Sequence, residues 1–214
     1  MMIIAIVAGG PREYLANIED YHTDEVTWIG VDRGVTYLKE FGLPIHNAFG
    51  DFDSISSSEM NELVDSIEEV AIFSPEKDKT DTEIALEWSI NQNPESIKIF
   101  GATGGRIDHL LANIHLLIHS IKSETEIEII DQQNRITLHT PGTYTIKKDT
   151  DKKYTSFIPI SLEVKGISLE GFKYPLKNCH IGLGSTLCIS NELIHEVGTF
   201  SFEDGILIMI RSCD

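Results

Sequence analysis

The sequence predicts an α/β domain with a mostly parallel, doubly wound sheet, followed by an all-β sandwich domain. Up to about residue 131, apolar runs of strand length alternate with stretches of helix length. From residue 135 onward the runs are short and alternating, with Gly, Pro and Asn between them, which is typical of a small antiparallel sandwich or barrel. No Gly/Ser-rich linker and no repeat of fixed period separates the halves. We therefore expect an α/β domain over residues 1–132 and a β-domain over residues 133–214, packed tightly against each other.

Six short apolar runs in the first half are expected to be strands, because each has strand length and is bounded by turn residues or by an amphipathic stretch. Strands that alternate with helices form a parallel sheet, and the connections between them should be right-handed. The expected strands are Met2–Ala8, Val26–Asp32, Ile45–Phe49, Glu69–Phe73, Ser96–Phe100 and Glu126–Ile130.

The expected helices lie between these strands and carry apolar residues at helical spacing. In residues 58–67, for example, Met60, Leu63, Val64 and Ile67 share one face. Gly and Pro residues follow several of these stretches and end them. The expected helices are Arg12–Asp20, Val35–Phe41, Ser58–Ile67, Asp81–Ile90 and Ile107–Ile121.

The second half contains no convincing helical pattern and is expected to consist of strands joined by turns. Its expected strands are Ile136–His139, Thr143–Lys147, Tyr154–Pro159, Leu162–Val164, Ile167–Leu169, Leu187–Ser190, Val197–Phe202 and Ile206–Arg211.

The charge of the chain limits its partners. Its 214 residues include 17 Lys and Arg against 34 Asp and Glu, which gives a net charge of −17. So acidic a surface disfavours nucleic acid and anionic membranes as partners. No apolar run approaches the length of a membrane span, and the start lacks the basic region of a signal peptide. With three cysteines at no metal-type spacing, we expect a cytoplasmic protein without a structural disulfide.

Two acids end the third expected strand, in the stretch Gly50-Asp51-Phe52-Asp53-Ser54. Two unpaired carboxylates about 4 Å apart repel by about 4 kcal/mol at an effective dielectric constant near 20. Such a pair favours a proton, an arginine or a metal ion nearby. The alternative is a solvated turn with two surface acids, since acids are common in turns.

The loops that follow the first five strands carry the chemistry that a polyphosphate needs. In a parallel sheet these loops share one edge, where ligands bind. Glycines allow close approach, helix N-termini and arginines bind phosphate oxygens, and aspartates are oxygen ligands for Mg²⁺. The edge is therefore predicted to bind a magnesium-bound polyphosphate. The loops are Gly9–Arg12, Asp32–Gly34, Asp51–Ser54, Lys77–Asp81 and Gly101–His109.

Several of these residues also have ordinary structural explanations. Asp32, Asp78 and Asp81 each stand where an aspartate commonly caps a helix, with Thr80 and Glu83 near the start of the next one. The sequence has neither a dinucleotide G-x-G-x-x-G pattern nor a P-loop. The double glycine before Arg106 and Asp108 has no obvious structural role. This stretch is therefore the most informative about a binding site.

Five motifs, taken in order along nearly the whole chain, resemble the thiamine pyrophosphokinase family. They are Gly50–Ser54, Asp78-x-Thr80-Asp81, Gly104-Gly105-Arg106-x-Asp108-His109, Gly184-Ser185-Thr186 and Ser190-Asn191-Glu192. The resemblance implies an α/β catalytic domain followed by a β-sandwich, in a homodimer. It also implies transfer of pyrophosphate from Mg·ATP to the hydroxyethyl group of thiamine, which gives thiamine diphosphate and AMP.

The resemblance also implies roles for individual residues. Asp51, Asp53 and Asp81 would be catalytic residues that bind the metal, and Asp108 would be a catalytic residue that helps Arg106 to hold the triphosphate. Either Asp108 or Asp78 would be the base that takes the proton of the acceptor hydroxyl. Residues on the ATP side would be Asp32, Arg33, Asp78, Thr80, Gly104, Gly105, Arg106 and His109. Residues on the thiamine side would be Ser185, Thr186, Ser190 and Asn191. Where some relatives have a tryptophan after Ser-Asn, this chain has Leu193, Ile194 and His195.

Two other functions remain open at this point. The Asp-x-Asp motif after a strand also resembles metal-dependent phosphohydrolases of the haloacid-dehalogenase type, in which the first Asp is the nucleophile. Those enzymes usually have a longer apolar run before the motif and a catalytic lysine further on, and Lys77 and Lys79 are poorly placed for that role. The third possibility is a sensor that binds nucleotide or thiamine without catalysis.

Overall fold

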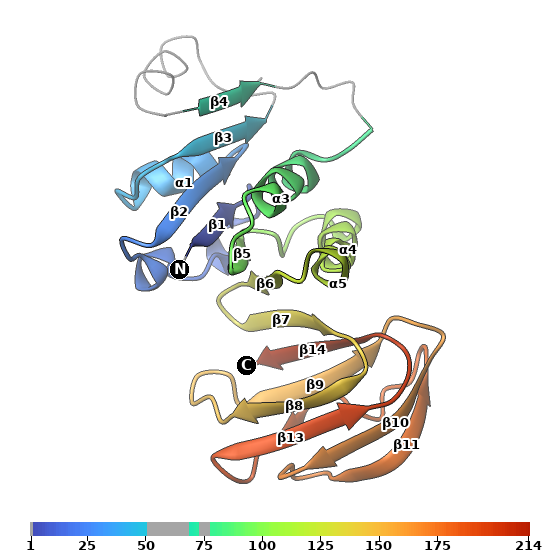
Figure 1. Cartoon of the computed structure of the whole chain (residues 1–214). Helices are drawn as coiled ribbons and strands as arrows, with labels where there is room; N and C mark the ends of the chain where they lie inside the picture. Colours follow the sequence, from blue (N-terminus) through green and yellow to red (C-terminus); the bar gives the residue numbers. More distant parts are fainter. Residues whose placement is uncertain (1, 51–68, 73–77) are drawn as a thin grey trace. The chain divides into compact units, whose positions relative to one another are not determined.

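The computed structural model describes residues 2–50, 69–72 and 78–214. The chain divides into two compact units, Met1–Gln132 and Gln133–Asp214, whose elements are labelled in Figure 1. The expected helix over residues 58–67, the end of the expected fourth strand, and the acids Asp51 and Asp53 lie outside the described residues.

The described strands of the first unit form a parallel sheet in the order β6-β5-β1-β2-β3-β4. From β1 the chain builds the sheet outward to β4 and then returns to place β5 on the other side of β1. The strand order therefore reverses between β1 and β5. The strands are β1 (Ile3–Val7), β2 (Val26–Val31), β3 (Asn47–Gly50), β4 (Glu69–Ile72), β5 (Ser96–Phe100) and β6 (Glu126–Ile130).

Helices cover both faces of this sheet, as expected for a doubly wound fold (Figure 1). Residues on α1 (Gly34–Glu40) pack with alternate residues of β1 and β2 in one apolar cluster, which includes Val7, Trp28 and Leu38. Helix α3 (Asp81–Asn91) lies against β1, β2 and β3, and buries Ala85 and Leu86. The other α-helices in the described part of the chain are α4 (Ile107–Leu116) and α5 (His119–Ser123).

The expected helix over residues 12–20 is wrong. The structure has two short 3₁₀ helices, Arg12–Tyr14 and Ile18–Tyr21. Between them Leu15 has extended backbone angles, and its side chain is buried in the core of the unit. Burial of this segment against the sheet therefore overrides its weak helical pattern.

The single helix expected over residues 107–121 is also wrong, because α4 ends at Leu116 and α5 begins at His119. Around the break the backbone forms tighter hydrogen bonds between residues three apart. The hydroxyl of Ser120 donates to the carbonyl of Leu117 at 2.8 Å, and the hydroxyl of Ser123 donates to the carbonyl of His119 at 2.9 Å. Serine side chains that bond to nearby carbonyls compete with regular helix hydrogen bonds.

The second unit has antiparallel strands in two groups, ordered β12-β9-β14-β7 and β11-β10-β13-β8. One apolar cluster draws on strands of both groups, with Phe157, Leu169, Phe200 and Met209 among its members. The parallel sheet and the separate antiparallel sheet agree with the expected fold class. The strands are β7 (Asn134–His139), β8 (Gly142–Lys147), β9 (Tyr154–Pro159), β10 (Glu163–Glu170), β11 (Leu176–Gly182), β12 (Asn191–Glu192), β13 (Val197–Phe202) and β14 (Leu207–Ser212).

Three details of the second unit differ from the expectation. The two runs expected at 162–164 and 167–169 form one strand, β10, in which Gly166 has a φ of +71° near an irregularity in the pairing with β11. The expected strand Leu187–Ser190 is a turn, and β12 begins only after it. Strand β11 was not predicted, because its side chains are mostly polar and exposed and show no alternating pattern.

Within the described residues, no helix is both long enough and apolar enough to cross a membrane.

Candidate functional site

A cavity of about 390 Å³ opens at the carboxyl ends of β1, β2 and β5. It lies where the strand order reverses between β1 and β5, which is the usual ligand position in an open α/β sheet. Six of the residues predicted for the ATP side line it: Asp32, Arg33, Gly104, Gly105, Arg106 and His109. The other lining residues are Ala8, Gly9, Gly10, Pro11, Thr82, Gly101, Ala102, Thr103 and Asn113.

The loops after β1 and β5 touch each other, backbone to backbone. The amide of Gly10 donates to the carbonyl oxygen of Gly101 at 2.8 Å. A Cβ atom on Gly10 would stand 2.4 Å from that oxygen, and a Cβ atom on Gly101, whose φ is +63°, would stand 2.3 Å from the carbonyl oxygen of Ala8. Both positions therefore require glycine. The hydroxyl of Tyr37 donates to the Gly10 carbonyl at 2.9 Å and fixes the first loop from the side of α1.

Asp32 directly follows β2 in the chain and lies beside Gly50, the last residue of the neighbouring strand β3. Gly50 precedes the two predicted acids in the sequence. The amide of Asp32 donates to the carbonyl of Phe49 at 2.9 Å, and a Cβ atom on Gly50 would stand 2.4 Å from the Asp32 carboxylate oxygen Oδ1. Its φ of +50° is uncommon for a residue other than glycine, and such strain often occurs at functional sites. Asp32 is not the N-cap of α1, because the N-cap is Arg33, whose side chain makes no capping hydrogen bond.

Arg106 and Asp108 form a two-pronged ion pair at the start of α4. Nη2 of Arg106 lies 2.5 Å from Oδ2 of Asp108, and Nε lies 3.1 Å from Oδ1. The hydrogen bond from Arg106 is the largest cause that lowers the pKa of Asp108 to about 2. The backbone amide of His109 also donates to Oδ1 of Asp108 at 3.0 Å. Asp108 is therefore ionised and weakly basic in this arrangement, while Arg106 is well exposed beside the cavity.

Arg12 and Arg33, which follow β1 and β2 in the chain, differ in position. Arg33 lines the cavity, and its guanidinium lies 5.5 Å from the centre of the Tyr37 ring. The guanidinium of Arg12 lies over the ring of Phe41 at 4.3 Å, and its Nε is 3.8 Å from the Glu40 carboxylate. Of the two, Arg33 is the one placed to meet a ligand in the cavity.

Thr80 is the N-cap of α3. Its hydroxyl oxygen accepts a hydrogen bond from the amide of Glu83 at 3.2 Å, which is the cap expected of a Thr-x-x-Glu sequence. The caps considered for Asp78 and Asp81 are therefore wrong, and Asp81 is the first residue of the helix. Among the described residues, Thr82 from this helix lines the cavity, whereas Asp78, Thr80, Asp81 and Asp108 do not.

Sequence reasoning missed three residues that support the loop after β5. The side-chain amide of Asn113 donates to the carbonyl of Ala102 at 2.9 Å, and the hydroxyl of Thr103 donates to the Asp131 carboxylate at 2.7 Å. Thr103 and Asp131 are both buried. An amide within the apolar stretch 107–121 was the available signal for Asn113, whereas the pairing of Thr103 with Asp131 depends on β5 and β6 being neighbours.

On the predicted thiamine side, in the second unit, Asn191 has a structural role. It is 2% exposed, and its Oδ1 accepts from the amides of Tyr174 and Glu192 at 3.0 and 2.9 Å. Its amide nitrogen donates to the Tyr174 carbonyl at 2.8 Å. Asn191 thus ties β12 to the segment of Tyr174, whose aromatic side chain is 58% exposed.

The other three predicted residues of this side lie in the turn before β12. Ser185 is half-buried, and Thr186 and Ser190 are exposed. The amide of Ser190, whose φ is +55°, donates to the hydroxyl oxygen of Ser156 at 2.9 Å. Neither tryptophan lies in this unit: Trp28 is fully buried, and Trp88 is half-buried with its ring 5.8 Å from that of Phe49.

The chain matches two family models in order. Residues 18–129 match "Thiamin pyrophosphokinase, catalytic domain", and residues 143–207 match "Thiamin pyrophosphokinase, vitamin B1 binding domain". The chain belongs to the thiamine pyrophosphokinase family. The thiamine pyrophosphokinase of Bacillus subtilis (strain 168) is 50% identical over 214 residues, which cover all of both chains.

Solved structures in the thiamine pyrophosphokinase family share the same fold. A crystal structure of thiamine pyrophosphokinase from Bacillus subtilis matches with a TM-score of 0.93 at 50% identity, over 99% of each chain. A thiamin pyrophosphokinase from Geobacillus thermodenitrificans matches with a TM-score of 0.90 at 52% identity, over all of this chain and 98% of the other. The family resemblance of the sequence motifs is thereby confirmed.

Proposed function

We propose that this protein transfers the pyrophosphoryl group of Mg·ATP to the hydroxyethyl group of thiamine, which yields thiamine diphosphate and AMP in the cytoplasm. The observation that carries this proposal is the cavity at the reversal of strand order, lined by Asp32, Arg33 and the Gly104-Gly105-Arg106 turn in a member of this family. Phosphoryl-type transfer consists mainly of positioning the groups and stabilising their charge, and this cavity offers groups for both.

The triphosphate of ATP is assigned to the edge of the parallel sheet. Arg106 would exchange its exposed partner Asp108 for phosphate oxygens, to which its planar fork is suited. Arg33 would hold the other end of the polyphosphate, and backbone amides of the turn at Gly104 and Gly105 would add further donors. Gly104, Gly105, Asp78, Thr80 and His109 complete the proposed ATP side.

The metal is assigned to Asp81 and to Asp51 and Asp53, which follow Gly50 in the sequence. The Asp32 carboxylate lies beside Gly50, at the end of β3. Carboxylate oxygens are the ligands that Mg²⁺ prefers, and one or two of them with substrate phosphates suffice. When bound, Mg²⁺ neutralises charge on the phosphate oxygens. The acceptor hydroxyl must lose a proton as its bond to the β-phosphorus forms, and the pKa of about 2 makes Asp108 a weaker base for it than a free aspartate.

The thiamine side is assigned to the second unit, with Ser185, Thr186, Ser190 and Asn191. Asn191 acts there by positioning, because the hydrogen bonds of its side-chain amide hold the backbone of Tyr174 and Glu192. The exposed ring of Tyr174 is an aromatic surface in a unit that contains no tryptophan.

The nucleotide product tests the reaction. Purified protein with Mg²⁺, ATP and thiamine should yield AMP and thiamine diphosphate in equal amounts, because attack at the β-phosphorus releases AMP. Chromatography of labelled nucleotides separates the outcomes. ADP with a monophosphorylated acceptor, or inorganic phosphate released at a rate that ignores thiamine, would favour a phosphohydrolase and contradict the proposal, while no consumption of ATP would favour a sensor.

The active form is proposed to be a homodimer in which both copies contribute to the acceptor site. The described residues leave large apolar side chains exposed on α4, where Ile107 and Leu111 are 70% and 52% exposed, and in the turn before β12, where Leu187 is 61% exposed. Burial of such side chains between subunits is favourable. Light scattering at assay concentration should give twice the mass of the chain, and a monomer with full activity would contradict the shared site.

A further inference from the structure

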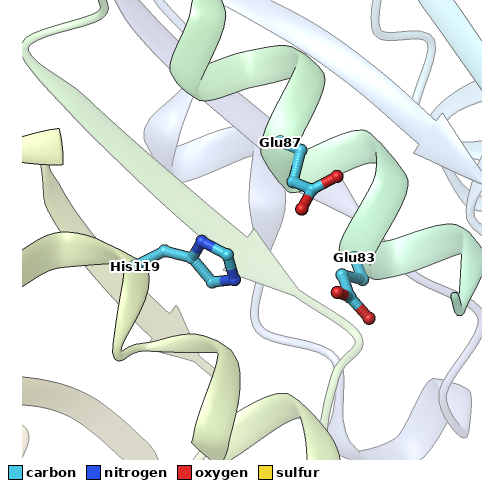
Figure 2. Close-up of side chains that lie close together, drawn as sticks. All are labelled: Glu83, Glu87 and His119. Atoms are coloured by element: carbon cyan, nitrogen blue, oxygen red, sulfur yellow. The ribbon is translucent and has the colours of Figure 1, made fainter. Parts of the chain in front are cut away.

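A second polar cluster lies on α3 and α5, and none of its residues is among those assigned to ATP. It consists of Glu83, Glu87 and His119, whose potential ligand atoms all lie within 4.8 Å of one another. Figure 2 shows the two glutamates on successive turns of α3, with the imidazole of His119 on the facing segment. All three residues are half-buried, so their side chains have room to move and remain accessible to an ion.

Local structure produces this convergence. Glu83 and Glu87 are four residues apart on a helix, and such residues lie on the same face. Asp81 is two residues before Glu83, which places it about 200° away around the helix axis, so the cluster and the proposed Mg²⁺ ligand face different directions. His119 is the first residue of α5, directly after the break that follows α4, and its backbone carbonyl accepts a hydrogen bond from the Ser123 hydroxyl.

The cluster already attracts a cation. The ammonium group of Lys79 lies 2.6 Å from each carboxylate oxygen of Glu87. The side chains of Lys79 and Glu87 are 45% and 37% exposed, and exposed ion pairs of this kind contribute little to stability. A divalent cation that is held by several ligands at once can therefore displace the lysine.

We propose that Glu83, Glu87 and His119 form a binding site for a divalent transition metal of the zinc type, for which Lys79 competes. Zn²⁺ commonly takes three protein ligands from imidazole and carboxylate groups and a water molecule as the fourth. An imidazole ligand favours such ions over Mg²⁺, which prefers oxygen. Ligand atoms around a tetrahedral Zn²⁺ are about 3.3 Å apart, so the three side chains need only rotate toward one another.

Such a site would link two parts of the first unit. It would join α3 to α5, and it would free Lys79, which stands directly before the helix cap Thr80. A bound metal should therefore raise the melting temperature of the protein, since a ligand that binds only the folded state stabilises it.

The test is isothermal titration of the full-length, untagged protein with Zn²⁺ in excess Mg²⁺, which would fill the proposed site at Asp51, Asp53 and Asp81. We expect one Zn²⁺ per chain, with affinity lowered about 10-fold or more in His119→Ala, His119→Gln and Glu83→Gln. Lys79→Gln should bind Zn²⁺ more tightly, because the competing cation is gone. Co²⁺ in place of Zn²⁺ should give a visible absorption spectrum that changes in His119→Gln.

The matched controls are His195→Ala and Glu126→Gln, which change exposed residues that are not members of the cluster and should bind Zn²⁺ like the wild type. Absence of Zn²⁺ binding in the wild type, or equal affinity in the wild type and both His119 variants, would overturn the proposal. Unchanged affinity in Lys79→Gln would overturn the role of Lys79. These results do not depend on pyrophosphate transfer, so this site and the proposed function can fail separately.

Discussion

Replacing Asp53 with asparagine should lower pyrophosphate transfer about 1,000-fold or more, because it removes a negative charge that the proposed metal requires while keeping the size of the side chain. The same loss is expected for Asp51→Asn. Both acids follow β3, which ends at Gly50 beside the Asp32 carboxylate. Production of AMP under saturating ATP and thiamine gives the rate.

A matched control separates this effect from a general loss of charge. Asp24→Asn removes an exposed aspartate of the first unit that is not near the cavity lining, and it should keep full activity. Circular dichroism and thermal unfolding should show that all three variants are folded, since none of them is expected to disturb the core. Full transfer activity in Asp53→Asn would refute the metal assignment.

The second large effect concerns the stability of the folded state below neutral pH, through His139. Burial lowers the pKa of His139 to about 4 from the usual value of 6.5. Its ring packs against those of Tyr144 and Phe200 with centroids 4.6 and 5.0 Å apart, and its Nε2 lies 2.9 Å from the hydroxyl of Thr137. A charged imidazole is therefore unfavourable in the folded state.

The direction in which stability changes with pH follows from the number of protons that the folded and unfolded states bind. Between pH 4 and pH 6.5 the unfolded chain binds a proton at this histidine and the folded chain does not, so stability rises with pH across this range. The neutral His139 makes its full contribution to the free energy of unfolding above pH 6.5. This contribution is lost as the pH falls toward 4. A shift of this size corresponds to about 3 kcal/mol.

Urea unfolding at a series of pH values measures this effect. The acidic chain has other groups that titrate below pH 6, so the informative quantity is the difference between the wild type and a variant. His139→Gln cannot titrate and should be less pH-dependent than the wild type between pH 4 and pH 6.5. The exposed control His195→Gln should follow the wild type. Parallel pH profiles for the wild type and His139→Gln would contradict the assignment.

Patterns that depend on near neighbours in the chain were predicted well. The parallel strands at residues 96–100 and 126–130 have the bounds expected from their apolar runs. Helix α3 begins at Asp81 as expected, because its start depends on a local capping sequence, Thr80 followed three residues later by Glu83. The failures came where packing or side-chain hydrogen bonds override propensity, as at the buried Leu15 and at the serine-bonded break after α4.

The motifs of the family were likewise visible in the sequence alone. A glycine turn followed by arginine and aspartate indicates phosphate binding from the residue types and their spacing, without a structure. The role of Asn191 was not visible. Its sequence neighbours suggest a ligand contact, but its side chain is buried and bonded to Tyr174, seventeen residues away in the chain. Hydrogen bonds over such a separation depend on strand pairing, which a single sequence does not specify.

The sequence by itself determined that glycines, arginines and aspartates follow a series of parallel strands, since strand length and turn residues are local properties. Only the tertiary structure decided the order of those strands, because the order depends on which faces pack together. That order sets β5 beside β1, brings the Gly10 and Gly101 backbones to within hydrogen-bonding distance, and opens the cavity between their loops. The tertiary structure also decided that Glu83, Glu87 and His119 meet, because α4 ends and α5 begins at a break with serine hydrogen bonds that the apolar pattern does not show.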